Sequence, residues 1–195
     1  MTRHVLIVED EPEVADLYRG YLADDYDVDV ATTGEEALEL ADETVDAVLL
    51  DRRLPDLSGS EVLTELRARD LNCRVAMVTA VEPDVDIIEM GFDLYLVKPA
   101  TRDDIVSAVE RLDTRANYDT KLQRTAALVT KRAVLETERT PTELRSSPEY
   151  DDLIARIEGL ESELDDLATA FSTDDYRMLF RDIGDDGSQS TTESV

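Results

Sequence analysis

Short apolar runs alternate with amphipathic stretches over the first 117 residues of the chain. The runs cover residues 5–8, 28–31, 46–51, 74–78 and 93–97. Most are bounded by turn-forming residues, which is typical of strands buried on both faces of a parallel sheet. Between them, apolar residues recur at helical spacing and predict helices at residues 12–22, 34–41, 58–70, 83–90 and 101–112. This alternation predicts an α/β domain with a doubly wound five-stranded parallel sheet.

The alternation stops near Asn117, and the rest of the pattern is helical. Residues 118–138 predict one helix, which carries Leu122, Ala126, Val129 and Ala133 at helical spacing. Residues 139–148 contain two prolines and two serines and indicate a linker or turn. A second helix at residues 149–171 repeats apolar side chains in steps of four and three, the spacing of a heptad seam. The members of this seam are Leu153, Ile157, Leu160, Leu164, Leu167 and Phe171.

These patterns divide the chain into three parts. We expect an α/β domain at residues 1–117, a small all-α domain at 118–183 with one more helical turn from Asp174, and a disordered tail at 184–195. Two helices of this kind predict either an antiparallel hairpin or a coiled coil that forms a homodimer through the Leu153–Phe171 seam. The pattern alone leaves both open.

The chain is strongly acidic, with 20 basic and 47 acidic residues and a formal net charge of −27. Because 42% of residues are hydrophobic, it can still build a core. An acid excess of this kind is typical of adaptation to concentrated salt, which screens self-repulsion. No apolar run approaches the roughly 20 residues of a membrane span. We therefore expect a halophilic, cytoplasmic protein without membrane contact. Its single cysteine and single histidine argue against an intramolecular disulfide, a CxxC site and a His-rich metal site.

Polar residues follow four of the five predicted strands. Glu9 and Asp10 follow the first, Asp51 the third, Thr79 the fourth and Lys98 the fifth. The carboxyl ends of parallel strands meet at one edge, so these side chains are expected to lie close together. Three carboxylates need a cation to offset their repulsion, and all-oxygen ligation favours Mg²⁺. A lysine and a hydroxyl beside them suit a phosphoryl group, and together with the metal they can activate one carboxylate as a nucleophile.

The order of these motifs resembles the receiver domain of two-component response regulators over about residues 3–117. The matching segments are VLIVEDEPEV, ATTGEEALEL, DAVLLDRRLPDLSG, the Thr79–Ala80 pair and DLYLVKP. The resemblance implies a flavodoxin-like fold. It also implies that Asp51 accepts a phosphoryl group from a cognate histidine kinase. Glu9, Asp10, Asp51 and the backbone carbonyl of Arg53 would then hold Mg²⁺.

The same resemblance assigns roles to the residues after the fourth and fifth strands. Thr79 and Lys98 would bind the phosphoryl oxygens, and small Ala80 would leave room for them. Tyr95 would act as a switch that turns inward when Thr79 moves, although a packed strand aromatic is the simpler alternative. Pro99 would follow a cis peptide bond. Arg53 and Val81 stand where the family varies, and Ala100 replaces a common phenylalanine, so the acyl-phosphate lifetime and the output surface are not predicted.

The layout of a receiver followed by about 70 acidic helical residues resembles the HalX class of haloarchaeal response regulators. We expect the helical part to bind a protein partner after phosphorylation. The alternative is a DNA-binding output, since residues 121–145 carry six basic against three acidic side chains. No recognition-helix signature supports it. A phosphatase that uses Asp51 as its nucleophile is disfavoured, because Arg53 stands where a haloacid-dehalogenase-type enzyme would place a second aspartate. We therefore do not expect a classical enzyme.

Overall fold

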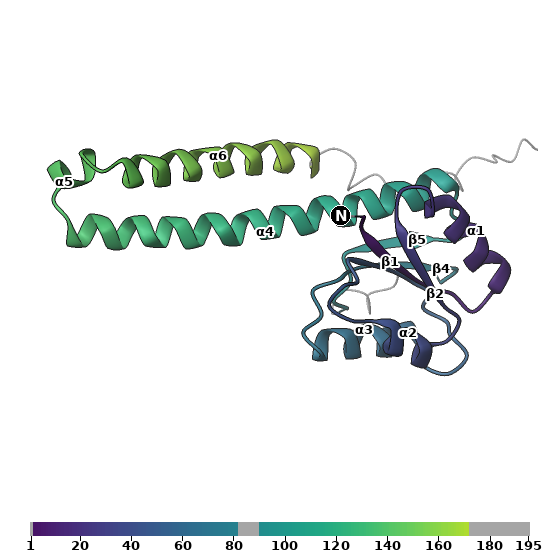
Figure 1. Ribbon diagram of the computed structural model, residues 1–195. Helices are drawn as coiled ribbons and strands as arrows, with labels where there is room; N and C mark the ends of the chain where they lie inside the picture. Colours follow the sequence, from purple (N-terminus) through teal and green to yellow (C-terminus); the bar gives the residue numbers. More distant parts are fainter. Residues whose placement is uncertain (1, 82–89, 172–195) are drawn as a thin grey trace, which may run out of the picture. The chain divides into compact units, whose positions relative to one another are not determined.

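The structure is a computed structural model that describes residues 2–81 and 90–171 (Figure 1). Most of the helix expected at 83–90, the turn from Asp174 and the tail at 184–195 lie outside these residues. The chain divides into two compact units after Asp119. Within the described residues, no helix is long and apolar enough to cross a membrane.

The first unit is built on a five-stranded parallel sheet, as predicted. Its strands are β1 (His4–Val8), β2 (Asp27–Ala31), β3 (Ala47–Leu50), β4 (Arg74–Thr79) and β5 (Leu94–Val97). They lie in the order β2-β1-β3-β4-β5. In register, Val8 pairs with Ala31 on one side and with Leu50 on the other. The connection after β1 therefore leads to β2 on one side, and the connection after β3 leads to β4 on the other side. This reversal leaves a crevice at the carboxyl ends of β1 and β3.

Helices cover both faces of this sheet. Helices α2 (Gly34–Leu40) and α3 (Gly59–Ala68) lie on one face, and α1 (Pro12–Leu22) and the first part of α4 lie on the other (Figure 1). Local sequence explains where they begin. Pro12 opens α1, where its missing N–H costs nothing. Ser58 opens α3 by accepting the Glu61 N–H, and the Glu61 carboxylate accepts the Ser58 N–H in return.

Helix α4 (Arg102–Glu138) corrects one prediction. The expected helices at 101–112 and 118–138 are a single helix of 37 residues that runs through Asn117 without a break. The stretch contains no glycine or proline that would stop it. Ion pairs hold it to the amino-terminal edge of the sheet, where Arg3 pairs with Asp113 and Arg74 pairs with Asp119. The expected domain boundary at residue 117 thus falls inside a helix.

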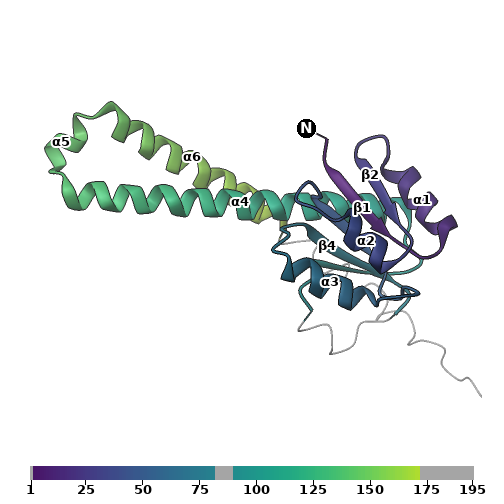
Figure 2. The ribbon, with the colours of Figure 1, turned by 60° about the horizontal axis from the view of Figure 1, so that its bottom comes forward.

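The second unit contains an antiparallel helical hairpin. The part of α4 beyond Asp119 is followed by α5 (Pro141–Arg145) and α6 (Pro148–Phe171), and α6 runs back beside α4 (Figures 1 and 2). The expected linker at 139–148 is thus partly helical, because Thr140 and Glu143 form a capping box around Pro141.

The hairpin buries part of the seam predicted on α6 but no member of the apolar series predicted on α4, of which only Val129 is half-buried. On α6, Ile157 and Leu164 of the predicted seam are buried. On α4, the buried side chains are Thr125 and Leu128. Leu122, which belongs to the predicted apolar series of that helix, is 47% exposed. The seam is therefore used at least in part within one chain, and dimerisation through it stays a prediction.

Candidate functional site

The predicted site residues meet at the carboxyl ends of β1 and β3. Glu9 and Asp10 follow β1, and Asp51 follows β3, so all three border the crevice between these strands. Backbone hydrogen bonds extend the sheet to this point, since the Asp51 N–H donates to the Val8 carbonyl over 2.9 Å and the Glu9 N–H donates to the Ala31 carbonyl over 3.0 Å. The backbone under these carboxylates is therefore fixed by the sheet itself.

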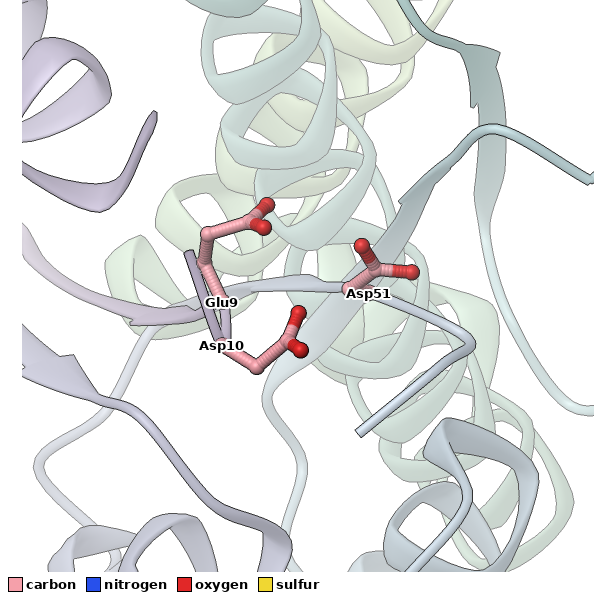
Figure 3. A group of neighbouring side chains, drawn as sticks. All are labelled: Glu9, Asp10 and Asp51. Carbon is pink, nitrogen blue, oxygen red and sulfur yellow. The ribbon is translucent and has the colours of Figure 1, made fainter. Parts of the chain in front are cut away.

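The three carboxylates form one cluster (Figure 3). Glu9, Asp10 and Asp51 each present an oxygen within 4.8 Å of the others. Glu9 and Asp51 are buried, with 2% and 6% of their surface accessible, whereas Asp10 is exposed. The cluster thus reaches from the protein interior to solvent, as a site that must admit a reactant requires.

Lys98 neutralises part of this charge from the end of β5. Its Nζ lies 2.6 Å from Glu9 Oε2 and 2.5 Å from Asp51 Oδ2. Burial raises the pKa of Glu9, although hydrogen bonding and attraction to Lys98 oppose this. Burial also opposes the charge of Lys98, but its hydrogen bonds to Asp51 and Glu9 outweigh that effect and raise its pKa. Lys98 is thus held as an ammonium ion between two carboxylates.

Thr79 ends β4, and Tyr95 lies in β5 three residues before Lys98. Thr79 is fully buried, and its Oγ1 accepts the Val81 N–H over 3.4 Å. Tyr95 is also buried, with 5% of its surface accessible, and its hydroxyl donates to the Val81 carbonyl over 2.7 Å. Both side chains therefore contact the backbone of the same residue. In this structure the Tyr95 ring lies inward.

The remaining predicted residues lie at the rim of the site. Arg53 is exposed, and its backbone N–H donates to Asp51 Oδ1 over 2.9 Å. Ala80 is exposed directly after Thr79. The Lys98–Pro99 peptide bond is cis. Arg53 thus binds one oxygen of the Asp51 carboxylate, and Lys98 binds the other. The role of the Arg53 carbonyl toward a metal stays a prediction.

Two residues that support the site were not predicted. An added Cβ at Gly59 would lie 2.2 Å from the Asp51 carbonyl oxygen, so only glycine lets α3 start this close to the phosphoacceptor candidate. Asp56 accepts the N–H groups of Gly34 and Glu35 over 2.8 Å each and so ties the loop after Asp51 to the start of α2. These bonds lower the pKa of Asp56 to about 2. Gly59 and Asp56 were visible only as turn-forming residues after the third strand.

The donor set fits a hard divalent cation. Three carboxylates face one ammonium, which leaves the cluster with two formal negative charges that a divalent ion would balance. Carboxylate oxygens are the ligands that Mg²⁺ prefers, and Mg²⁺ commonly keeps several waters beside one or two protein carboxylates. Because Asp10 is exposed, an ion held by this cluster would be open to solvent on that side.

Comparisons with known families agree with this geometry. Residues 5–110 match the family model of the response regulator receiver domain, and residues 114–180 match that of the HalX domain. The first match covers more than half of the chain and contains every predicted site residue. The second covers the hairpin, including α5 and the described part of α6.

Two curated relatives match this chain over different lengths. A Haloferax volcanii protein is 45% identical over 82% of this chain and 27% of its own length. The transcriptional regulatory protein PrrA of Mycobacterium leprae is 41% identical over 55% of this chain and 48% of its own length. The chain thus spans between about a quarter and a half of these relatives.

Solved structures resemble the first unit. The response regulator TrrA of Thermotoga maritima, in complex with Mg²⁺ and BeF, is 30% identical and aligns with a TM-score of 0.51 over 57% of this chain and 99% of its own. A CheY-like receiver domain from Methanospirillum hungatei is 28% identical with a TM-score of 0.54, over 58% of this chain and 95% of its own.

Proposed function

Since the chain is a two-component response regulator, with a receiver domain joined to a HalX domain, we propose that Asp51 accepts a phosphoryl group from a cognate histidine kinase. The observation that supports this most strongly is the convergence of the Glu9, Asp10 and Asp51 carboxylates with Lys98 at the crevice of the sheet. The receiver part acts as a phosphoacceptor switch rather than as an enzyme with a separate substrate and product.

Mg²⁺ would be held by Glu9, Asp10, Asp51 and the backbone carbonyl of Arg53. When bound, it supplies positive charge that offsets the charge of the phosphoryl oxygens. Support comes from the all-oxygen donor set and its excess negative charge. The TrrA structure, which is similar to the first unit, was determined with Mg²⁺ and BeF.

The side chains of this protein then have distinct tasks in the transfer. One Asp51 carboxylate oxygen forms a bond to phosphorus while the bond between phosphorus and the kinase histidine breaks, and the histidine nitrogen keeps the electron pair. Lys98, which already contacts Asp51, would bind an oxygen of the transferred group as a point charge. The Arg53 N–H, which donates to the Asp51 oxygen that Lys98 does not contact, would keep the carboxylate oriented during this step.

Thr79 and Tyr95 would carry the signal away from Asp51. A phosphoryl group on Asp51 offers a strong acceptor for the Thr79 hydroxyl, and Ala80 leaves room beside it. If Thr79 moves toward this acceptor, its bond to the Val81 N–H is lost. Tyr95 holds the carbonyl of the same residue, so a change at Thr79 alters the anchor of the Tyr95 ring.

We further propose that the helical output binds a protein rather than DNA. The basic residues that suggested DNA are partly neutralised within the hairpin, since Lys121 pairs with Glu163 and Arg132 lies 3.8 Å from Glu136. Concentrated salt also weakens binding that depends on counterion release. Gel-shift titrations with duplex DNA at increasing KCl test the alternative. Saturable binding that persists at high salt would favour DNA.

Phosphorylation is tested by incubating the full chain with acetyl phosphate and Mg²⁺ in high-salt buffer. Intact-protein mass spectrometry should show one added phosphoryl group, which hydroxylamine removes because it is an acyl phosphate. Asp51→Asn should show none. Asp46→Asn, which alters the carboxylate before the same strand, is the matched control and should be modified like the wild type. Equal modification of Asp51→Asn, or no modification of the wild type, would contradict the proposal.

A further inference from the structure

One side of α4 in the second unit differs in composition from the rest of the chain. Between residues 122 and 137, this side carries no charged side chain, although 34% of all residues are charged. Its members, which we call the α4 outer face, are Leu122, Gln123, Ala126, Ala127, Val129, Thr130, Ala133, Val134 and Thr137. All are exposed except the half-buried Val129, and Val134 reaches 58% exposure. Apart from Gln123 and two threonines its exposed members are apolar, and contiguous exposed apolar surface is typical of interaction sites.

The hairpin does not use this face. The side of α4 that packs toward α6 carries the buried Thr125 and Leu128, and Lys121 reaches Glu163 of α6 from the same side. At 3.6 residues per turn, the centre of the outer face lies largely opposite these residues. Among the described residues, α6 thus covers the side of α4 that carries Leu128 and leaves most of the outer face exposed.

The hairpin also has a small core. Among the described residues after Asp119, the buried ones are Thr125, Leu128, Leu144, Ile157 and Leu164. Helices in proteins depend on tertiary packing of their apolar faces for most of their stability. A helical unit with so few buried side chains would gain from covering a second apolar face, as helical bundles do.

The distribution of charge favours a second copy of the same chain as the occupant. Helix α6 carries eight acidic residues and one basic residue. It packs on the side of α4 away from the outer face. Two copies that meet through their outer faces therefore keep their acidic α6 helices apart, and only uncharged surfaces are brought together. DNA would need cations, which this face lacks.

The side chains of the face also suit symmetric packing. Ala126 and Ala133 are small and lie seven residues apart, between the larger Leu122, Val129 and Val134. Such alternation lets the ridges of one helix enter the grooves of another. A two-fold axis presents the same surface to both partners, so a face that complements itself is sufficient. We propose that the α4 outer face binds the α4 outer face of a second copy and forms a four-helix assembly.

Light scattering and sedimentation of the full chain in high-salt buffer test this proposal. The wild type should have twice the mass of the 21.8 kDa chain. The double variant with Ala126→Lys and Ala133→Lys should have a dimer dissociation constant at least 100-fold higher, because it places like charges opposite each other in the interface. Circular dichroism should show unchanged helix content, because lysine is nearly as good a helix former as alanine.

The matched control places two lysines seven residues apart on exposed positions of α6, as Ala155→Lys with Ser162→Lys, and should leave the dimer intact. The wild-type dimer should strengthen with KCl, since salt screens repulsion between acidic copies. A monomeric wild type, an unaffected Ala126/Ala133 variant or an equally weakened control would each overturn the proposal. A monomeric full chain that dimerises only after removal of residues 172–195 would show that this segment is the occupant instead. The same measurements on Asp51→Asn separate this proposal from the phosphorylation switch.

Discussion

Replacing Gly59 by alanine tests the packing beneath Asp51. The new Cβ would lie 2.2 Å from the Asp51 carbonyl oxygen and 2.9 Å from the Arg52 Cα. Both are backbone atoms, so no side-chain rotation can relieve the contact. The start of α3 and the backbone after β3 would have to separate by about 1 Å in a close-packed interior.

The expected loss of stability follows from two opposing terms. Overpacking a core costs about 1–3 kcal/mol of stability. Because the atoms contacted here are backbone atoms that cannot rotate away, we expect a cost at or above the upper end of that range. Alanine in place of glycine in a helix returns up to about 1 kcal/mol. We therefore expect Gly59→Ala to lower the free energy of unfolding by about 2 kcal/mol or more. Because Asp51 shifts with its backbone, phosphorylation by acetyl phosphate should slow by about 100-fold, the effect expected of a 1 Å misplacement.

Gly20→Ala supplies a control with the same chemical change. Gly20 lies within α1 and has no atom within 4 Å of the added Cβ, so its replacement should stabilise the protein by about 0.5–1 kcal/mol. Urea unfolding in high-salt buffer gives both values from the midpoints and slopes. If Gly59→Ala were as stable as Gly20→Ala and were phosphorylated at the wild-type rate, the proposed close packing under Asp51 would be wrong.

Three further predictions concern residues around the phosphoacceptor. Lys98→Met leaves two buried carboxylates without their partner and should cost about 3 kcal/mol in Mg²⁺-free urea unfolding; the loss should shrink with added Mg²⁺, and an unchanged midpoint would contradict the ion-pair role. Asp56 has a folded pKa of about 2 against an ordinary value of 3.8. The contribution of the Asp56 carboxylate to the free energy of unfolding is therefore complete above pH 3.8 and lost as the pH falls through 2. The difference in unfolding free energy between the wild type and Asp56→Ala should accordingly close over this range rather than stay constant. Thr79→Ala should still be phosphorylated, but the NMR signals of the Tyr95 ring should no longer respond, whereas Thr79→Ser should retain the response; a full response in Thr79→Ala would exclude the hydroxyl as the relay.

The local pattern of the sequence determined the sheet and most of its site. Strands such as β3 are apolar because both faces are buried, so their positions are visible without any knowledge of their neighbours. All strands of a parallel sheet end at one edge, whatever their order. For that reason Glu9, Asp51 and Lys98 could be placed together from sequence alone, and the structure brings them within hydrogen-bonding distance through the Lys98 ammonium.

Contacts between distant residues decided the rest. The steric need for Gly59 exists only because α3 begins against the backbone of Asp51. Helix α4 continues through Asn117 because neither glycine nor proline stops it there, and its ion pairs to Arg3 and Arg74 exist only in the folded sheet.

The burial of α4 in the hairpin shows most clearly what the sequence determines and what tertiary packing decides. Spacing singled out the series Leu122, Ala126, Val129 and Ala133, which is exposed or half-buried, whereas the buried side chains are Thr125 and Leu128. The spacing therefore determined that α4 is an amphipathic helix but not which surface is covered. That choice depends on where Ile157 and Leu164 of α6 pack, and burial is a property of the folded pair rather than of either helix alone.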